Sequence, residues 1–441
     1  MIGILLLLAA TAHAAPPPCT PPTTHGPVTQ LPTWDQPIAN SWSGYAPVSS
    51  TTSLFYHITD AAAAPNATLL VWTNGGPGAS SVAFGDFYQN IGPFHVDATT
   101  GNLAPNPNSF HAGGFATLFL DHPCPTGLSI CCGDSAPGTQ EANAQEYVAA
   151  VKLILRRHAQ FATRDVYLCG ESYAGRFVPA IATEMIAQGV TQLRGLLTNG
   201  EVDAAAGFAS YAPYLFANGW IAEPQRQALE ATAKECSALV AAKQWAAATH
   251  TCYTIRTRAA LWTNHSYWDY DIRYPAHGQP YAAAEARTIA YLDRADVRAA
   301  LHAVSPSVKP VIEGAGAGGH DAWANFNATG DFCKSAVSLL PPMLEGGQLR
   351  VLIYTGQFDE CMNVLSTENW LPTLAWPHTA AFVNTSRVAW NARGALPVTA
   401  GFWRRIGPLS QMIVLRAGHM ATLEQPAATL AMYKDFVAGL I

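Results

Sequence analysis

Ser172, Asp359 and His419 are the three residue types that together can activate a serine nucleophile, and each follows a predicted β-strand. A serine hydroxyl is a weak nucleophile until a base takes its proton, and a histidine imidazole can act as that base. A carboxylate bonded to the imidazole fixes its tautomer and stabilises the imidazolium that forms. Ligands of open α/β sheets bind beyond the carboxyl ends of the strands, so we expect these side chains to meet there. The pattern predicts a serine hydrolase with Ser172 as nucleophile, His419 as base and Asp359 as the orienting acid.

The residues around Ser172 favour a sharp turn from a strand into a helix. Ser172 lies in Gly170-Glu171-Ser172-Tyr173-Ala174, with a small residue two positions away on either side. Small residues there let the strand and helix approach while the hydroxyl stays exposed, and the chain order Ser, Asp, His is that of α/β-hydrolases. Each residue also has a structural alternative. Ser172 could be a helix N-cap, Asp359 a turn residue, and His419 a structural histidine, since the chain has 14 histidines. The strand context and the presence of all three favour catalysis.

Apolar segments with strand composition alternate with helical patterns along much of the chain. The predicted strands are residues 69–73, 116–120, 166–169, 349–354 and 411–415. A helix is predicted for residues 141–158, where apolar residues recur at spacings of three and four. This alternation is typical of a doubly wound, mostly parallel sheet. The predicted fold class is therefore α/β, specifically the α/β-hydrolase fold.

The pattern changes between residues 206 and 335, which are rich in Ala, Tyr and Trp and show helical segments without a parallel-sheet rhythm. We interpret this stretch as a mainly helical cap inserted into a core that consists of residues 15–205 and 336–441. Residues 1–14 contain an apolar run followed by the small-residue pattern Ala12-His13-Ala14. This favours a signal peptide, because the run is too short for a membrane-spanning anchor.

Composition and charge exclude several function classes. The chain has 441 residues, of which 49% are hydrophobic and 12% charged, and its net charge is −6 without long charged runs. Such a chain can bury a large core, and it presents no electrostatic footprint for nucleic acid or an anionic membrane. The cysteines and histidines do not show zinc-ligand spacing, and we predict no metal or cofactor. The expected partner is a peptide or another small molecule.

Four Asn-X-Ser/Thr sequons and nine cysteines favour passage through the secretory pathway. The sequons predict glycosylation at Asn66, Asn264, Asn327 and Asn384. An odd number of cysteines leaves at least one thiol unpaired, and Cys169 is the candidate because it lies in an apolar predicted strand. The other eight cysteines allow 105 pairings, and none is assigned.

Beyond these patterns, the chain resembles the serine carboxypeptidase family over nearly its whole mature length. Residues 71–78, Val-Trp-Thr-Asn-Gly-Gly-Pro-Gly, match the family's Trp-x-Asn-Gly-Gly-Pro-Gly loop. Residues 170–175, Gly-Glu-Ser-Tyr-Ala-Gly, match its nucleophile motif, and Gly418-His419-Met420 matches its histidine motif. Further similar segments are Ser43-Gly44-Tyr45, Leu54-Phe55-Tyr56, Gly92-Pro93-Phe94, residues 119–123 and Asn199-Gly200. The number of motifs in the same order makes the resemblance specific.

The resemblance implies a serine-type carboxypeptidase, which releases the C-terminal residue of a peptide through an acyl-enzyme on Ser172. Such an exopeptidase must recognise a free carboxylate beside the scissile bond. The resemblance assigns this role to Asn74, Gly75 and Glu171. Glu171 can donate a hydrogen bond to a carboxylate only when it is protonated, so better hydrolysis at acidic pH is expected.

The resemblance also implies a site for the negative charge that develops on the carbonyl oxygen during hydrolysis. The backbone N–H groups of Gly76 and Tyr173 would form this oxyanion hole, and one such donor is typically worth about 10²–10³ in kcat. Met420 would line the pocket for the leaving residue. The expected substrates are therefore peptide or protein C-termini.

Three positions depart from the family pattern. Ala79 follows the Gly-rich loop where the family usually has a cysteine, so one common disulfide to the cap must be absent. Asn90 stands where a glutamate usually shares a proton with the carboxylate-binding glutamate. An amide there could still hydrogen-bond Glu171, but it carries no charge that would raise the pKa of Glu171, so the pH optimum is expected to shift. Ala421-Thr422 replace the Val-Pro that often follows the His-Met pair.

Two alternatives to peptide hydrolysis stay open from the sequence. Some family members pass the acyl group to an acceptor alcohol, and no motif separates such an acyltransferase from a peptidase. The second alternative is a non-catalytic protective partner, although the intact Ser, Asp and His residues and the Gly-rich loop argue against it. The leader and sequons predict a secreted, lysosomal or vacuolar protein. The sequence also leaves open whether the chain forms a homodimer.

Overall fold

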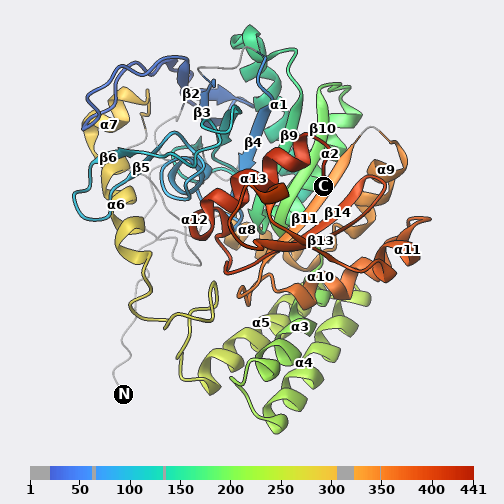
Figure 1. The fold of residues 1–441 in the computed structure, drawn as a ribbon. Coiled ribbons are helices and arrows are strands. Elements are labelled where there is room, and N and C mark those ends of the chain that lie inside the picture. The colour runs from blue at the N-terminus through green and yellow to red at the C-terminus, as the bar shows by residue number, and fades with distance from the viewer. Residues whose placement is uncertain (1–19, 62–65, 133–135, 305–321, 348) are drawn as a thin grey trace, which may run out of the picture.

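The computed structural model describes residues 20–61, 66–132, 136–304, 322–347 and 349–441 (Figure 1). The predicted signal peptide lies outside these ranges. Twelve strands of the described residues form one sheet in the order β1-β2-β3-β7-β4-β9-β10-β11-β14-β13-β12, with β8 paired to β3, and β5 and β6 form a separate pair. The strands are β1 (His25–Pro27), β2 (Ser41–Pro47), β3 (Thr52–Thr59), β4 (Leu69–Thr73), β5 (Phe94–Val96), β6 (Leu103–Pro105), β7 (Ala116–Leu120), β8 (Ile130–Cys131), β9 (Val166–Ser172), β10 (Leu193–Gly200), β11 (Arg350–Gly356), β12 (Val388–Trp390), β13 (Gly401–Ile406) and β14 (Leu409–Val414).

The centre of the sheet is parallel and its two edges are antiparallel. Strands β7, β4, β9, β10, β11 and β14 pair in parallel. Strands β1, β2, β3 and β8 on one side, and β13 and β12 on the other, are added in antiparallel pairs. Every residue of β4 and β7 is buried, as expected for parallel strands covered on both faces. The parallel centre matches the predicted sheet, whereas the sequence pattern did not predict the antiparallel edges.

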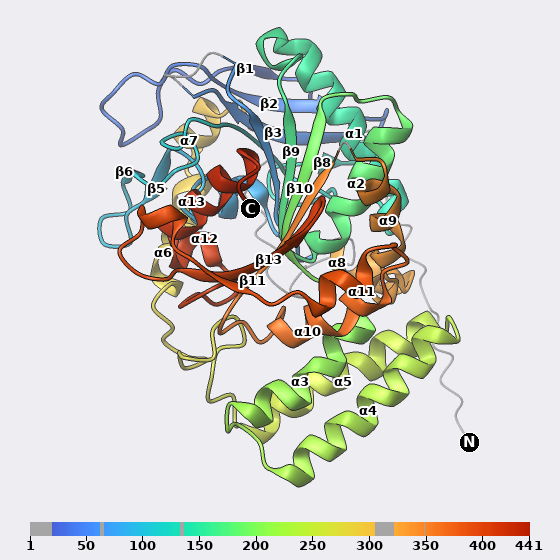
Figure 2. The same cartoon turned by 45° about the vertical axis from the view of Figure 1, so that its right-hand side comes forward.

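Side chains of the central strands alternate between two hydrophobic cores, one on each face of the sheet. In β4, Leu69 and Val71 belong to one core, and Leu70 and Trp72 belong to the other. Helices α1 and α2 contribute to the first core and α13 to the second (Figure 2). The helices outside the insertion are α1 (Gln140–Arg157), α2 (Ala174–Ala187), α9 (Leu340–Glu345), α10 (Val364–Trp370), α11 (Thr379–Asn384), α12 (Ala421–Glu424) and α13 (Pro426–Val437).

A mainly helical insertion separates β10 from β11. Its helices are α3 (Ala204–Ala217), α4 (Glu223–Ala241), α5 (Trp245–Trp262), α6 (Ala282–Asp293), α7 (Ala295–Ala300) and α8 (Ala322–Ala328). Helices α3, α4 and α5 pack on one another and form a layer of their own beside the sheet (Figures 1 and 2). Helices α6 and α7 lie apart from that layer, and α6 packs near β5. The cap boundaries at residues 206 and 335 stay a prediction.

Two disulfides are described, Cys124–Cys131 and, between α4 and α5, Cys236–Cys252. Cys169 is buried and unpaired, as predicted from its place in an apolar strand. The other eight cysteines do not all pair, however, because Cys333 and Cys361 are also buried and unpaired. They lie in different surroundings: the Cys333 thiol contacts the Thr249 hydroxyl at 3.4 Å inside the insertion, and Cys361 follows β11.

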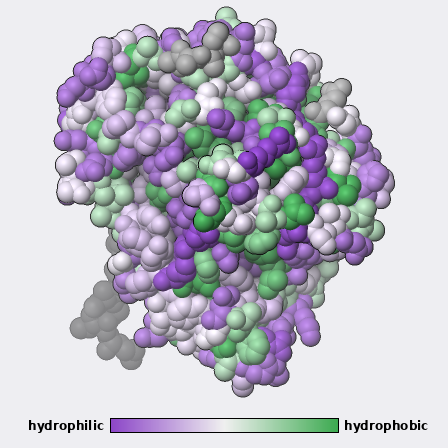
Figure 3. Space-filling model, viewed as in Figure 1, coloured by the Kyte–Doolittle hydropathy of each residue, from purple (hydrophilic) through white to green (hydrophobic). Residues whose placement is uncertain are grey.

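Three of the four predicted glycosylation sites are exposed to solvent. Asn66, Asn264 and Asn384 are exposed, and Asn327 is partly buried. Hydrophilic and hydrophobic residues are mixed over the face seen in Figure 3. None of the described helices has the length and apolar character that crossing a membrane requires. Glycosylation at these asparagines stays a prediction.

Candidate active site

Ser172 stands at the sharp turn between β9 and α2. Its φ angle of 66° places it in the left-handed region, which a non-glycine residue rarely adopts and which is the geometry of a sharp strand-to-helix turn that exposes a nucleophile. The strand and helix approach so closely that a Cβ atom on Gly170 would lie 2.7 Å from Ala174 Cβ and 2.7 Å from Val178 Cγ2. The small residues at positions 170 and 174 therefore permit the turn, as the sequence pattern indicated.

His419 and Asp359 meet beside this turn. His419 Nδ1 lies 2.8 Å from Asp359 Oδ2, and both side chains are almost completely buried. The other carboxylate oxygen, Asp359 Oδ1, accepts a hydrogen bond from the backbone N–H of Met362 at 2.9 Å, which fixes the carboxylate plane. Within the described residues, His419 Nε2 is buried without a hydrogen-bond partner. The imidazole is thus oriented by one nitrogen and has the other available as a base.

A cavity of about 740 Å³ contains Ser172 and His419 in its wall. Gly75, Gly76 and Tyr173 line the same cavity. A Cβ atom on Gly75 would lie 2.3 Å from the backbone nitrogen of Tyr173 and 2.8 Å from Ser172 Cβ. The absence of a side chain at position 75 therefore lets the Gly-rich loop lie against the nucleophile turn.

A buried chain of hydrogen bonds connects the Gly-rich loop with the residue before the nucleophile. Trp72 Nε1 donates to Asn74 Oδ1 at 2.7 Å, and Asn74 Nδ2 donates to Gln89 Oε1 at 3.2 Å. Gln89 Nε2 in turn donates to Glu171 Oε1 at 2.7 Å. The second oxygen, Glu171 Oε2, is buried and has no hydrogen-bond partner among the described residues. Because Oε1 accepts from an amide, Oε2 is the atom that can carry a proton.

The partner of Glu171 differs from the one considered in the sequence. Asn90 has a φ angle of 60°, and its amide reaches the carbonyl oxygen of Leu423 at 3.5 Å instead of Glu171. Gln89, one residue earlier, takes the position beside Glu171. Sequence reasoning missed Gln89 because two adjacent amides cannot be distinguished by residue type, and which of them points inward depends on the local backbone.

Burial and charge set the pKa values of the two ionisable groups at the cavity. Burial raises the pKa of Glu171 to about 7, although His419 and the hydrogen bond from Gln89 oppose the rise. Burial by itself would lower the pKa of His419, but the carboxylates of Asp359 and Glu171 outweigh it and raise that pKa to about 9. Each group therefore depends on the charge of the other.

The insertion supplies most of the remaining wall of the cavity. Its aromatic side chains include Phe208, Tyr211, Tyr253, Trp268 and Tyr270. The ring of Tyr270 is stacked on the imidazole of His419, with centroids 4.5 Å apart and planes 24° from parallel. Met420, predicted to line the leaving-residue pocket, also lines the cavity. The richness of residues 206–335 in Tyr and Trp was the sequence signal for this wall, but it did not identify Tyr270.

The parallel sheet, the strained turn at Ser172 and the His419–Asp359 pair in the same cavity are features expected of the α/β-hydrolase fold and of a serine hydrolase. A model of the serine carboxypeptidase family matches residues 32–439. The chain therefore belongs to the serine carboxypeptidase family, and the family and enzyme class predicted from the motifs are confirmed.

Individual relatives agree with this assignment. "Serine carboxypeptidase-like 50" of Arabidopsis thaliana is 29% identical, over 98% of this chain and 92% of its own length. "Serine carboxypeptidase S10 family member 1" of Dictyostelium discoideum is 26% identical, over 90% of this chain and 93% of its own. The crystal structure of Kex1(delta)p, a prohormone-processing carboxypeptidase from Saccharomyces cerevisiae, superposes with a TM-score of 0.79 at 18% identity, covering 95% of this chain and 94% of that one. The last similarity confirms the predicted fold.

Proposed function

We propose that this protein is a serine-type carboxypeptidase that hydrolyses the C-terminal peptide bond of peptides or proteins through an acyl-enzyme on Ser172. The observation that carries the proposal is the cavity shared by two sets of residues. One set is Ser172 with the oriented imidazole of His419, whose Nε2 has no partner among the described residues. The other is Glu171 with an unpartnered oxygen beside Asn74, which suits recognition of a carboxylate.

In the first half of the reaction, Ser172 Oγ attacks the carbonyl carbon while its proton moves to His419 Nε2. The negative charge on the carbonyl oxygen is stabilised by the backbone N–H groups of Gly76 and Tyr173. The C–N bond then breaks, the imidazolium gives its proton to the leaving amine, and the C-terminal amino acid departs. Water, activated by His419 in the same way, then hydrolyses the ester on Ser172.

Recognition of the substrate carboxylate requires a donor on Glu171. Glu171 Oε2 donates to the carboxylate when it is protonated. Asn74 is linked to Glu171 through Gln89, which hydrogen-bonds both side chains. With a pKa of about 7, Glu171 is mostly protonated below that pH and repels the substrate above it. Protonation of Glu171 also removes one negative charge near His419, which lowers the pKa of the imidazole and so offsets part of the loss of neutral base at low pH. Recognition of the carboxylate therefore favours acidic pH, whereas the neutral imidazole that acylation needs is favoured at higher pH.

Glu171→Gln is expected to remove the pH dependence of substrate binding. For the wild type, KM for an N-blocked dipeptide with a free carboxylate should rise about tenfold between about pH 6 and 8, following the protonated fraction of a group with a pKa of about 7. A glutamine keeps an N–H donor at every pH, so its KM should stay constant over this range. Steady-state kinetics at each pH measure both profiles.

Two controls make this experiment specific to the carboxylate. The C-terminally amidated dipeptide should show no such rise with either enzyme, and the exposed Glu345→Gln variant should behave as the wild type. A wild-type KM that is constant from about pH 6 to 8 would refute the role given to Glu171. The same holds if the Glu171→Gln variant keeps the rise.

The predicted leader and sequons support entry into the secretory pathway, with the protein secreted or retained in a lysosome or vacuole. Exposure of Asn66, Asn264 and Asn384 is consistent with glycosylation on that route. An acidic lysosomal or vacuolar lumen would also keep Glu171 protonated.

A further inference from the structure

A short segment of the insertion, residues 269–273, lies across both loops that carry the histidine and the aspartate. On the histidine loop, the backbone N–H of His419 donates to the carbonyl oxygen of Tyr270 at 2.6 Å. On the aspartate loop, the N–H of Ile272 donates to Phe358 O at 3.1 Å, and the N–H of Glu360 donates to the carbonyl oxygen of Asp269 at 3.1 Å. These bonds flank Asp359 on both sides in the sequence.

The backbones of residues 269–273, of the Asp359 loop and of the His419 loop lie too close together to admit a side chain at Gly418 or Gly356. A Cβ atom on Gly418 would lie 2.3 Å from the carbonyl oxygen of Tyr270 and 2.7 Å from Asp271 Cβ. A Cβ atom on Gly356, at the start of the aspartate loop, would lie 1.9 Å from the carbonyl oxygen of Gly418. The insertion therefore packs directly on the catalytic loops, and no layer of side chains separates them.

Arg273 joins all three segments through one guanidinium group. It forms an ion pair with Asp271 of the insertion, with Nε 2.9 Å from Asp271 Oδ1. Its Nη2 donates to the carbonyl oxygen of Arg416 and to Glu424 Oε2, both at 3.1 Å. The guanidinium carbon also lies 4.4 Å from the ring centroid of Phe358, the residue before Asp359.

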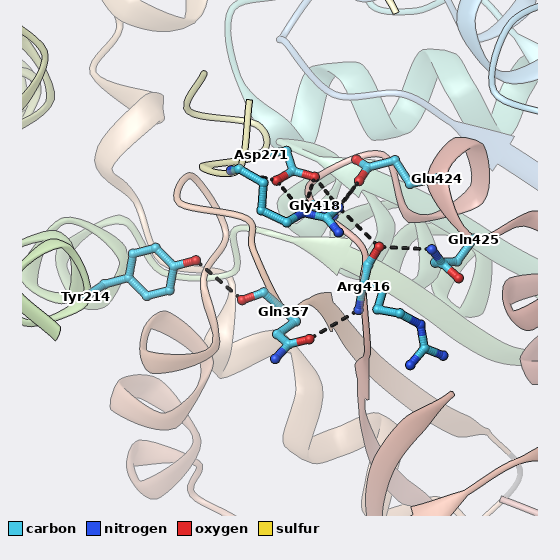
Figure 4. A network of polar contacts seen from close by, with 8 residues as sticks. Tyr214, Asp271, Gln357, Arg416, Gly418, Glu424 and Gln425 are labelled. Carbon is cyan, nitrogen blue, oxygen red and sulfur yellow. Dashed lines mark hydrogen bonds and ion pairs between the residues drawn. The ribbon is translucent and has the colours of Figure 1, made fainter. Parts of the chain in front are cut away.

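Glu424 links Arg273 to the histidine loop. Its Oε2 accepts a hydrogen bond from the backbone N–H of Gly418 at 2.8 Å, directly before His419. Figure 4 shows Asp271, Gly418 and Glu424 gathered at this point, with Gln357 reaching the backbone N–H of Arg416. The side chains of Asp271 and Glu424 are almost completely buried, and Arg273 supplies the positive charge beside the Asp271 carboxylate. Burial and the neighbouring Asp271 raise the pKa of Glu424 to about 9, so Glu424 acts there as a neutral hydrogen-bonding group below that pH.

We propose that Arg273, held by Asp271 and Glu424, is a positioning residue that fixes the Asp359 and His419 loops in register, so that the insertion is part of the catalytic framework as well as a cover for the cavity. The inference rests on the proposed function, because it concerns the rate of the chemistry at Ser172. It predicts that Arg273 affects turnover more than substrate binding, since the residues that bind the carboxylate lie on other segments.

Arg273→Met keeps an apolar stem and removes the guanidinium group, and it should lower kcat about 10²-fold, as expected for a catalytic pair displaced by about 1 Å. KM for the free-acid dipeptide should change less than about threefold. Arg273→Lys, which retains the positive charge, should recover about tenfold of the lost kcat. A fluorophosphonate that labels activated serines provides two further readouts. The endpoint counts competent sites, and the labelling rate should fall in parallel with kcat.

Arg294→Met is the matched control, because Arg294 pairs with Asp296 at an exposed position away from both loops. It should retain wild-type kcat. Wild-type kcat per labelled site in Arg273→Met would overturn the proposal, as would a loss of kcat that Arg294→Met shares. Failure of the proposed function is distinguishable, since the wild type itself would then show no turnover that depends on Ser172.

Discussion

Replacing Asp359 by asparagine is expected to lower kcat by about 10⁴-fold, while the fold stays intact because the two side chains have nearly the same shape. Asp359 Oδ1 accepts a hydrogen bond from the N–H of Met362, and an asparagine oxygen can keep that bond. The amide nitrogen would then face His419 Nδ1, where the carboxylate oxygen now lies at 2.8 Å. A donor at this position forces the imidazole proton onto Nε2, so the imidazole can no longer accept the proton of Ser172.

The Asp359→Asn result is measured as kcat and as the rate of labelling by a serine-directed fluorophosphonate. Both should fall together, because both need Ser172 to be activated by His419. Asp296→Asn, an equivalent change at an exposed position, should leave both unchanged. A loss smaller than about tenfold in Asp359→Asn would show that the imidazole does not depend on this carboxylate.

Replacing Gly75 by alanine is expected to lower kcat by about 10²–10³-fold, the effect of losing one oxyanion donor. The new methyl group would lie 2.3 Å from the backbone nitrogen of Tyr173 and 2.8 Å from the carbonyl oxygen of Glu171. Neither backbone atom can move without changing the turn at Ser172, so the Gly-rich loop must withdraw. The N–H groups of Gly76 and Tyr173, the proposed oxyanion donors, would then lose their relative placement.

Gly346→Ala is a suitable comparison for Gly75→Ala, because the nearest atom to its new Cβ would be 3.4 Å away, an ordinary contact distance. Its kcat should equal that of the wild type. Thermal unfolding of both variants checks that the proteins remain folded. A Gly75→Ala enzyme with wild-type kcat would contradict the close approach of the Gly-rich loop to the nucleophile turn.

The elements that position the candidate catalytic residues were predictable because their signals are local. The strand at residues 69–73 agrees with β4, the strand at residues 116–120 agrees with β7, and the helix at residues 141–158 differs from α1 by one residue at each end. Runs of buried apolar residues bounded by turn residues identify such parallel strands directly. The antiparallel edges carry weaker patterns, since they depend on pairing between segments that are distant in sequence.

Contacts that depend on backbone direction or on distant segments could not be predicted. Gln89 and Asn90 are both amides, and their residue types do not indicate that Gln89 is the one that reaches Glu171. The contact between Arg273 and Glu424 spans segments that are far apart in sequence, and nothing in the composition of either segment indicates it. Motifs therefore predicted the residues proposed to react with substrate, but not the residues that hold them in place.

The most direct test of the central claim is release of the C-terminal residue from an N-blocked dipeptide at about pH 5, comparing the wild type with Ser172→Ala and the free acid with its amidated twin. We predict that the wild type cleaves the free acid well and the amide poorly, and that Ser172→Ala releases no amino acid. Ester hydrolysis that depends on Ser172 without peptide cleavage would contradict the account in favour of an acyltransferase or esterase. Absence of any Ser172-dependent turnover would contradict it in favour of a non-catalytic partner.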